Sequence, residues 1–338
     1  MKVAELEKPG SLRVKSKPLR ALRTGEVLIK VESCGLCGTD IHIVDGTSRS
    51  TPPVVLGHEY AGFVTDPGDS PEGIPEGTHV AVDPNISCGR CPYCRRGLVH
   101  LCTGLRALGV DIDGGMAEYS IVPASALYTI PRELTAEESM FIEPVSCAVH
   151  GMDRAGVRPG DTVAILGGGT IGLVMLQLVL HGGAAAVVVS EPLEYKRKIA
   201  AALGASLVVD PGSGALRRAV MDTTEIGADV VIDCAGTGAT ARASLELARR
   251  GGRVLFFGVC PIGETIPLEP NAVYFRELTI AGSYVNPFTF QRAIALLKGG
   301  VVRVAPLAVR GYPLEGVHDA LDSLRAGRAL KNMIVPGS

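Results

Sequence analysis

The stretch TVAILGGGTIG, residues 162–172, decides the fold of this chain, because it joins an apolar strand to a glycine-rich turn and a helix. Gly167, Gly169 and Gly172 form the pattern G-x-G-x-x-G between the run TVAIL and the helical stretch IGLVMLQLVL. The first glycine permits a tight turn, the second lets the backbone approach a pyrophosphate, and the third lets helix and strand pack closely. A glycine-rich turn that only packs is the alternative. The context predicts a dinucleotide site at the helix N-terminus.

The residues that follow this motif predict a parallel sheet. Strands such as AAVVVSE and ADVVIDCAG alternate with helical stretches as far as about Tyr284, which is typical of a doubly wound α/β domain. Glu191 lies at the end of the strand after the motif, where a carboxylate can accept hydrogen bonds from the adenosine ribose. Its charge repels a 2′-phosphate and therefore favours NAD. Lys196 and Arg197 soften that preference, so NADP is the alternative.

The first half of the chain has a different pattern of apolar and turn residues. The runs VLIKVESCG, HVAVDPNI and AEYSIVP have strand lengths and are separated by turn residues, which predicts a β-rich domain. Between the second and third runs lie four cysteines within fifteen residues: Cys88, Cys91, Cys94 and Cys102. Four thiolates on short spacers predict a closed, structural zinc site without an open position for substrate. A redox Cys-x-x-Cys pair and a disulfide cluster are the alternatives.

Length and composition set outer limits on the class of protein. A chain of 338 residues favours two domains of ordinary size. The net charge of −2, without a basic run interleaved with aromatics, argues against nucleic acid as a partner. No signal-peptide pattern and no apolar run of membrane-spanning length is present, and the cysteines outside the cluster are scattered. We therefore expect a soluble, cytoplasmic protein with no membrane partner.

A second group of metal-ligating residues lies in the β-rich half. The Cys37 thiolate, the His58 imidazole and one carboxylate, from Glu59 or Glu143, would leave a fourth position for water or substrate. That is the open pattern of a catalytic zinc. Taken singly, each residue has a plainer interpretation: a core thiol, a hydrogen-bonded His–Glu pair, or a solvated carboxylate at a helix start. Their combination with the cysteine cluster and the dinucleotide motif favours the metal site.

At this point the chain resembles a known family, the zinc-dependent medium-chain alcohol and polyol dehydrogenases. The resemblance covers essentially the whole chain, and the order of the motifs is its specific part. These motifs are Cys-Gly-Thr-Asp-x-His at 37–42, Gly-His-Glu at 57–59, the cysteine cluster, Glu-Pro at 143–144 and the nucleotide motif. The resemblance implies an α/β protein with a GroES-like β-rich catalytic domain and a Rossmann doubly wound parallel-sheet domain. The catalytic domain would comprise residues 1–147 and 286–338, and the Rossmann domain residues 148–285.

The resemblance also implies a reaction. Hydride would pass from a secondary alcohol, such as a polyol, cyclitol, diol or amino alcohol, to NAD, and a ketone would form. Thr39 would accept the hydroxyl proton and pass it through the cofactor ribose toward His42. Asp40 would fix the ring of His58.

The two carboxylates beside the expected catalytic zinc indicate a branch of the family. Glu59 is the first choice for the third ligand, and Glu143 would bind directly or hold the zinc water. Both carboxylates resemble those of the sorbitol and threonine dehydrogenase branch. The alternatives are a zinc alcohol dehydrogenase that uses NADP, an L-threonine 3-dehydrogenase-like enzyme, and a catalytically silent cofactor-binding relative. The family further implies a small-molecule alcohol substrate and a homodimer or homotetramer.

Overall fold

The computed structural model describes residues 1–70 and 73–337 and divides into two compact units. The β-rich unit consists of Met1–Pro144, Pro287–Lys298 and Ala308–Ser338. The parallel-sheet unit consists of Val145–Asn286 and Gly299–Leu307. Within the described ranges, no helix is long and apolar enough to cross a membrane.

The main sheet of the β-rich unit has seven strands, with β3 near its centre. In β3, Val27, Ile29 and Val31 are buried while Lys30 is exposed, so one face of the strand packs into the core. This confirms the strand expected at VLIKVESCG. Along the sheet the order is β10 (Leu127–Thr129), β6 (His79–Val82), β5 (Glu59–Asp66), β3 (Glu26–Gly35), β18 (Asn332–Val335) and β17 (Arg310–Pro313), and β9 (Tyr119–Pro123) pairs with β3.

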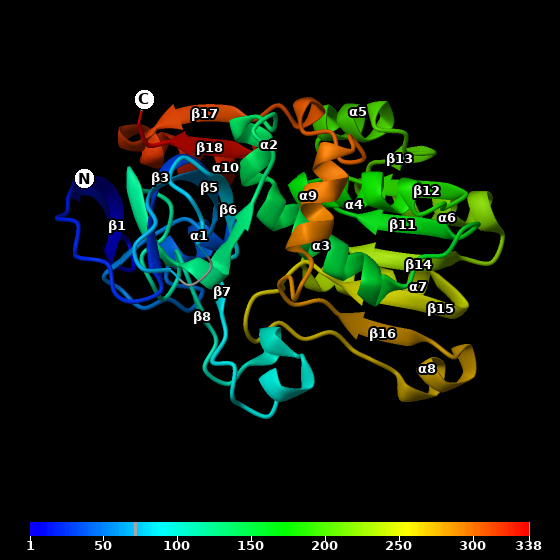
Figure 1. Ribbon diagram of the computed structural model, residues 1–338. Coiled ribbons are helices and arrows are strands. Elements are labelled where there is room, and N and C mark those ends of the chain that lie inside the picture. The colour runs from blue at the N-terminus through cyan, green and yellow to red at the C-terminus, as the bar shows by residue number, and fades with distance from the viewer. Residues whose placement is uncertain (71–72, 338) are drawn as a thin grey trace. The chain divides into compact units, whose positions relative to one another are not determined.

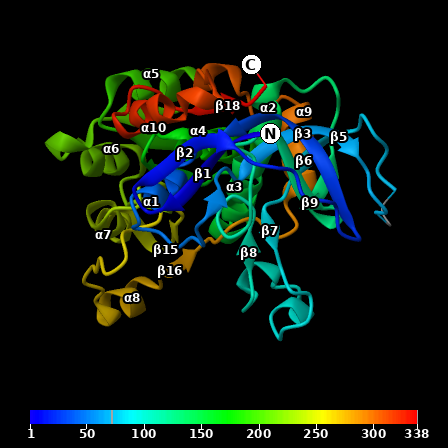
Figure 2. The ribbon, with the colours of Figure 1, turned by 90° about the vertical axis from the view of Figure 1, so that its left-hand side faces the viewer.

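Smaller sheets and short helices complete this unit. Figure 2 shows β1 and β2 side by side, and β7 and β8 together near the segment that carries the four cysteines. The sheets are β2 (Ser11–Ser16), β1 (Lys2–Lys8) and β4 (Val54–Val55), and the pair β7 (Asn85–Ile86) and β8 (Arg106–Ala107). The α-helices are α1 (Gly38–Val44), α2 (Ala136–Met140), α9 (Phe290–Lys298) and α10 (Val317–Arg325).

The parallel-sheet unit contains the expected doubly wound sheet. Figure 1 shows its six strands stacked in the order β13 (Leu207–Val209), β12 (Ala186–Ser190), β11 (Thr162–Leu166), β14 (Ala228–Asp233), β15 (Ala248–Phe256) and β16 (Thr279–Gly282). All five pairings are parallel. The helices are α3 (Ile142–Ala155), which begins in the last residues of the β-rich unit, α4 (Thr170–His181), α5 (Glu194–Ala202), α6 (Ala215–Thr224), α7 (Gly238–Leu247) and α8 (Pro270–Arg276). The strand order reverses between β11 and β14, where ligands bind at the carboxyl ends of the strands in such sheets.

A C-terminal segment returns to the parallel sheet. The expected domain ranges place Gly299–Leu307 with residues 286–338, whereas the structure groups the segment with the parallel-sheet unit. The buried side chain of Gln177 in α4 explains this grouping, because its oxygen accepts the Arg303 N–H at 2.8 Å. Its amide also donates to the Arg303 carbonyl at 3.4 Å. The expected domain ranges as such stay a prediction.

Candidate functional site

The four cysteines of the predicted closed site come together in the segment beyond β7 and β8. The sulfur atoms of Cys88, Cys91, Cys94 and Cys102 all lie within 4.8 Å of one another, and none forms a disulfide. Two short 3₁₀ turns, Cys94–Arg96 and Val99–Leu101, bend the chain back on itself.

Backbone N–H groups donate hydrogen bonds to sulfur atoms of this cluster. The N–H groups of Cys88 and Gly104 both donate to Cys102 Sγ at 3.3 Å. Bonds from the backbone N–H groups of Cys94 and Thr103 lower the pKa of Cys91 to about 6, which favours its thiolate. Four sulfurs at this spacing fit a structural zinc and offer no further position for a substrate.

The second expected group of ligands forms around the start of α1 and of β5. The ligand atoms of Cys37, His58 and Glu59 lie within 4.8 Å of one another. Cys37 is the N-cap residue of α1, and Glu59 is the first residue of β5. Glu143, at the start of α3, is 8 % exposed and lies outside this close group. The geometry therefore brings Glu59 beside the thiol and the imidazole.

Asp40 joins the first two ligands. One of its oxygens accepts the Cys37 N–H at 2.9 Å, and the other lies 3.5 Å from Nδ1 of His58. Asp40 is fully buried, and apart from this ion-pair contact neither its Oδ1 nor the Nδ1 of His58 has a hydrogen-bond partner among the described residues. This arrangement fixes the imidazole ring and leaves Nε2 as its ligand atom.

The protonation of His58 follows from the same neighbours. Burial disfavours the charged ring, but Asp40 and the thiol of Cys37 outweigh burial and raise the pKa of His58 well above its ordinary value. A thiol and two carboxyl groups thus gather around the ring, and these are the ligand types of a zinc site. The residues present fit a catalytic zinc held by Cys37, His58 and a carboxylate.

Lys331 is a neighbour of this cluster that sequence reasoning missed. Its ammonium forms an ion pair with Glu59, and both side chains are buried. Burial alone lowers the pKa of Lys331, but the charges of Glu59 and Cys37 outweigh it and raise the pKa, so the lysine is charged. The ammonium also lies 5.8 Å from the ring centroid of Phe141. The two partners are 272 residues apart in sequence, so no local pattern signals their contact.

The expected proton-relay residues lie on α1. The Cys37 thiol lies 3.6 Å from the Thr39 hydroxyl, and both Thr39 and His42 are exposed. His42 Nδ1 is 3.2 Å from the hydroxyl of Thr47. Residues three apart share one side of a helix, so Thr39 and His42 have compatible positions. Their role in proton transfer stays a prediction.

The glycine motif forms part of the wall of a cavity of about 550 Å³ in the parallel-sheet unit. Gly167, Gly169, Glu191 and Lys196 line it. Gly167 has φ 102°, a value that side-chain-bearing residues rarely adopt, and a Cβ on Gly172 would collide with the Gly167 carbonyl oxygen. The turn and the close helix–strand packing expected from the first and third glycines are therefore present.

The carboxylate of Glu191 is fixed in this cavity. One oxygen accepts the Gly168 N–H and the other accepts the Leu193 N–H, both at 2.9 Å. Arg197 does not line the cavity, because its guanidinium binds the carbonyl oxygens of Glu191 and Pro192 and a carboxylate oxygen of Asp210. The expected softening of cofactor preference by Arg197 stays a prediction.

Comparisons with known proteins agree with these sites. Residues 23–132 match the family model described as the alcohol dehydrogenase GroES-like domain, and residues 170–299 match the one described as zinc-binding dehydrogenase. D-arabinitol dehydrogenase 1 of Uromyces fabae is 32% identical over 334 residues, which cover 98% of this chain and 95% of the relative. L-threonine 3-dehydrogenase of Pyrococcus horikoshii is 36% identical over 315 residues, with coverages of 91% and 90%.

A solved structure is also similar to this chain over almost its whole length. A zinc-binding dehydrogenase from Sinorhizobium meliloti 1021, bound to NADP, has a TM-score of 0.95 and 41% identity, and the match covers 99% of each chain. Both matched modules are parts of dehydrogenases, which defines the protein as an oxidoreductase of the zinc-containing type. The chain belongs to the zinc-dependent medium-chain alcohol and polyol dehydrogenases. The expected family, the pairing of GroES-like and Rossmann folds and the class of enzyme are confirmed.

Proposed function

We propose that the protein oxidises a secondary alcohol of a polyol, cyclitol, diol or amino alcohol to the ketone and transfers the hydride to NAD. The close group of Cys37, His58 and Glu59 carries this proposal, because three protein ligands leave a position for the substrate oxygen. Relatives named as arabinitol, sorbitol and threonine dehydrogenases support the range of alcohols. Polyols rank first within that range.

We assign a separate role in the reaction to each of these residues. Cys37, His58 and a carboxylate would hold a zinc ion, which would supply a Lewis acid for the alcohol hydroxyl. Asp40 holds the imidazole of His58 in one orientation. Thr39 would accept the hydroxyl proton, and His42, which is exposed on the same helix, would pass it on at the surface.

Glu59 or Glu143 would provide the third zinc ligand. Glu59 lies close to Cys37 and His58, and its carboxylate forms an ion pair with Lys331. Glu143 would then bind directly or hold the zinc water. Gly167, Gly169, Glu191 and Lys196, which line the cavity, would hold the dinucleotide, with Glu191 on the adenosine ribose. Gly172 would keep the turn close to the helix.

A substrate panel tests this function. Polyols, cyclitols, diols and L-threonine are assayed with NAD by the absorbance of the reduced nicotinamide, on protein with measured zinc content. We expect NAD-dependent turnover of one secondary alcohol at two zinc ions per chain. Full activity of the Cys37→Ala variant would refute the catalytic zinc, and turnover of L-threonine alone would assign the amino-alcohol activity.

We also propose a homodimer or homotetramer that pairs through the edge strand β16. This strand ends the parallel sheet, and the preceding helix α8 exposes Tyr274 by 76% and Phe275 by 68%. Exposed apolar side chains beside the outer edge of a sheet are typical of an interface. Light scattering should give a multiple of the monomer mass, and Phe275→Glu should lower it. A monomeric wild-type protein would contradict the assembly.

We also propose limits for the two domains and a cellular location. We place a catalytic domain at residues 1–147 and 286–338 and a Rossmann domain at 148–285. A cytoplasmic location is supported by nine free cysteines without a disulfide.

A further inference from the structure

Two cations line the dinucleotide cavity beside Glu191. Lys196 lies on α5 and Arg217 on α6, and both belong to the walls of the 550 Å³ cavity. Among the residues that the structure describes, no carboxylate pairs with either of them. The Lys196 ammonium lies 5.9 Å from the ring centroid of Tyr195. Both positive charges are therefore available to an anion that enters the cavity.

Arg217 was not identified from the sequence, and neither Arg197 nor Arg218 lines the cavity. Arg197, which is closer to Glu191 in the chain, is bound to two carbonyl oxygens and to Asp210. Arg218 follows Arg217 on α6 but does not line the cavity. The rotation of the helix between consecutive residues separates the two arginines.

We propose that Arg217, together with Lys196, binds the 2′-phosphate of NADP, so that the cavity accepts both NAD and NADP. This inference rests on the proposed dinucleotide-dependent function and extends it to a second cofactor. A guanidinium presents paired N–H donors that match phosphate oxygens, and a phosphomonoester carries nearly two negative charges at neutral pH. The cavity volume is within the range of small-ligand sites.

Two features of the walls favour this ligand. Glu191 would repel a 2′-phosphate, but its two oxygens each accept a backbone N–H, which holds the carboxylate in place and disperses part of its charge. The first turn of α6 contains no acidic residue, and its N-cap is Gly214, which also lines the cavity. The positive end of the α6 dipole therefore adds to the charge of Arg217.

The test compares dissociation constants of NADH and NADPH, measured by calorimetry on the zinc-loaded protein. We expect the wild-type protein to bind both. In Arg217→Gln the ratio of the NADPH constant to the NADH constant should rise at least about tenfold, which is the loss of a charge-assisted hydrogen bond. Arg217→Lys should recover part of the ratio, because it restores the charge. Glu191→Gln should move the ratio in the opposite direction.

Matched controls separate this proposal from simpler ones. Arg218→Gln removes an arginine of the same helix outside the cavity and should leave the ratio unchanged. The fragments 2′,5′-ADP and 5′-ADP should reproduce the difference without the nicotinamide. Equal weakening of NADH and NADPH by Arg217→Gln would assign the guanidinium to the adenine and overturn the proposal. Binding of NADH but not NADPH by the wild-type protein would also overturn it, whereas binding of neither would refute the proposed function itself.

Discussion

The buried pair of Lys331 and Glu59 sets the charge balance beside Cys37. Two ionised side chains with almost no solvent contact are stable only as partners, since each alone would lose its hydration without compensation. Gly35 makes room for the pair, because a Cβ there would collide with the carboxylate of Glu59. The lysine therefore allows the carboxylate of Glu59 to lie buried beside Cys37.

Removal of this lysine should strongly destabilise the protein. In Lys331→Met the Glu59 carboxylate stays buried without its partner, and we expect a loss of about 3–5 kcal/mol in the free energy of unfolding. Urea denaturation of the zinc-free protein measures this change, because a zinc ion at Cys37 and His58 would itself pair with Glu59. The double variant with Glu59→Gln should recover most of the loss. Lys298→Met, at an exposed lysine, is the control, and a loss as small as that of the control would contradict the prediction.

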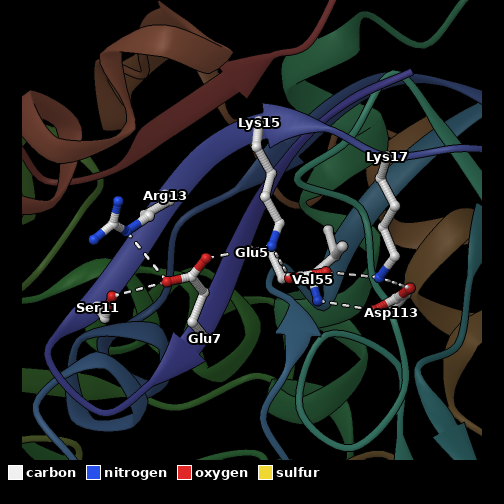
Figure 3. Close-up of polar contacts among 8 residues, drawn as sticks. All are labelled: Glu5, Glu7, Ser11, Arg13, Lys15, Lys17, Val55 and Asp113. Atoms are coloured by element: carbon white, nitrogen blue, oxygen red, sulfur yellow. Dashed lines mark hydrogen bonds and ion pairs between the residues drawn. The ribbon is translucent and has the colours of Figure 1, made fainter.

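At the scale of elements, charged side chains tie the hairpin of β1 and β2 to the rest of its unit. Figure 3 shows Glu5 of β1 between Lys15 and Lys17, at 2.5 and 2.7 Å. Lys17 also contacts Asp113 at 2.7 Å, and Asp113 accepts the Val55 N–H of β4. The network thereby links the hairpin to β4 and to the loop of Asp113.

This network should make stability depend on pH. Burial raises the pKa of Glu5, but hydrogen bonds from Lys15 and Lys17 outweigh it and lower the pKa below 4.5. Its contribution is therefore fully present above the unfolded value of 4.5 and is lost as the pH falls through the folded value. Glu5→Gln should lower the free energy of unfolding by about 1–3 kcal/mol at pH 7 and by progressively less in acid. Denaturation at pH 7, 5 and 3 checks this.

Glu7 provides the matched control for Glu5. It contacts Arg13 and Lys15, but its side chain is 38% exposed against 5% for Glu5. Solvent screens such a pair, so Glu7→Gln should change stability by less than about 1 kcal/mol. Similar losses in both variants would show that burial of Glu5 has no special effect.

A second element-scale contact holds the returning C-terminal segment. Gln177 satisfies both backbone groups of Arg303 from the interior of α4. In Gln177→Leu these groups lose their partner, and we expect a loss of about 1–3 kcal/mol in stability. Hydrogen exchange should increase at residues 299–307 in particular. Unchanged protection there would mean that apolar packing alone holds the segment.

At the scale of the whole molecule, two zinc ions would have separate effects. The cysteine cluster lies in a turn-rich segment without an extended core, so its shape depends on the metal. Cys91→Ser should leave about one zinc per chain and expose this segment to proteases, while NADH binding stays within about twofold of wild type. Metal analysis, limited proteolysis and calorimetry check these results. Two zinc ions in the variant would contradict the assignment.

The dinucleotide half was largely predictable from sequence because its signals are local. The strand, the turn of Gly167 and the helix that starts at Thr170 follow one another in the chain, and each residue type has a steric or electrostatic reason. Cys88 to Cys102 are likewise close in sequence, so their spacing alone predicted the cluster. The strands of the β-rich half were predicted from length and composition, and β3 confirmed the first of them.

The sequence by itself therefore determined the family and the two folds, and it predicted the residues with metal or nucleotide chemistry. Only the tertiary structure decided which groups meet: Lys331 with Glu59, Gln177 with Arg303, and Arg217 with the cavity of Glu191. It also showed Arg197 to be bound elsewhere. The physical reason is that spacing and periodicity record neighbours along the chain, whereas charge pairing and burial depend on segments that only the folded chain brings together.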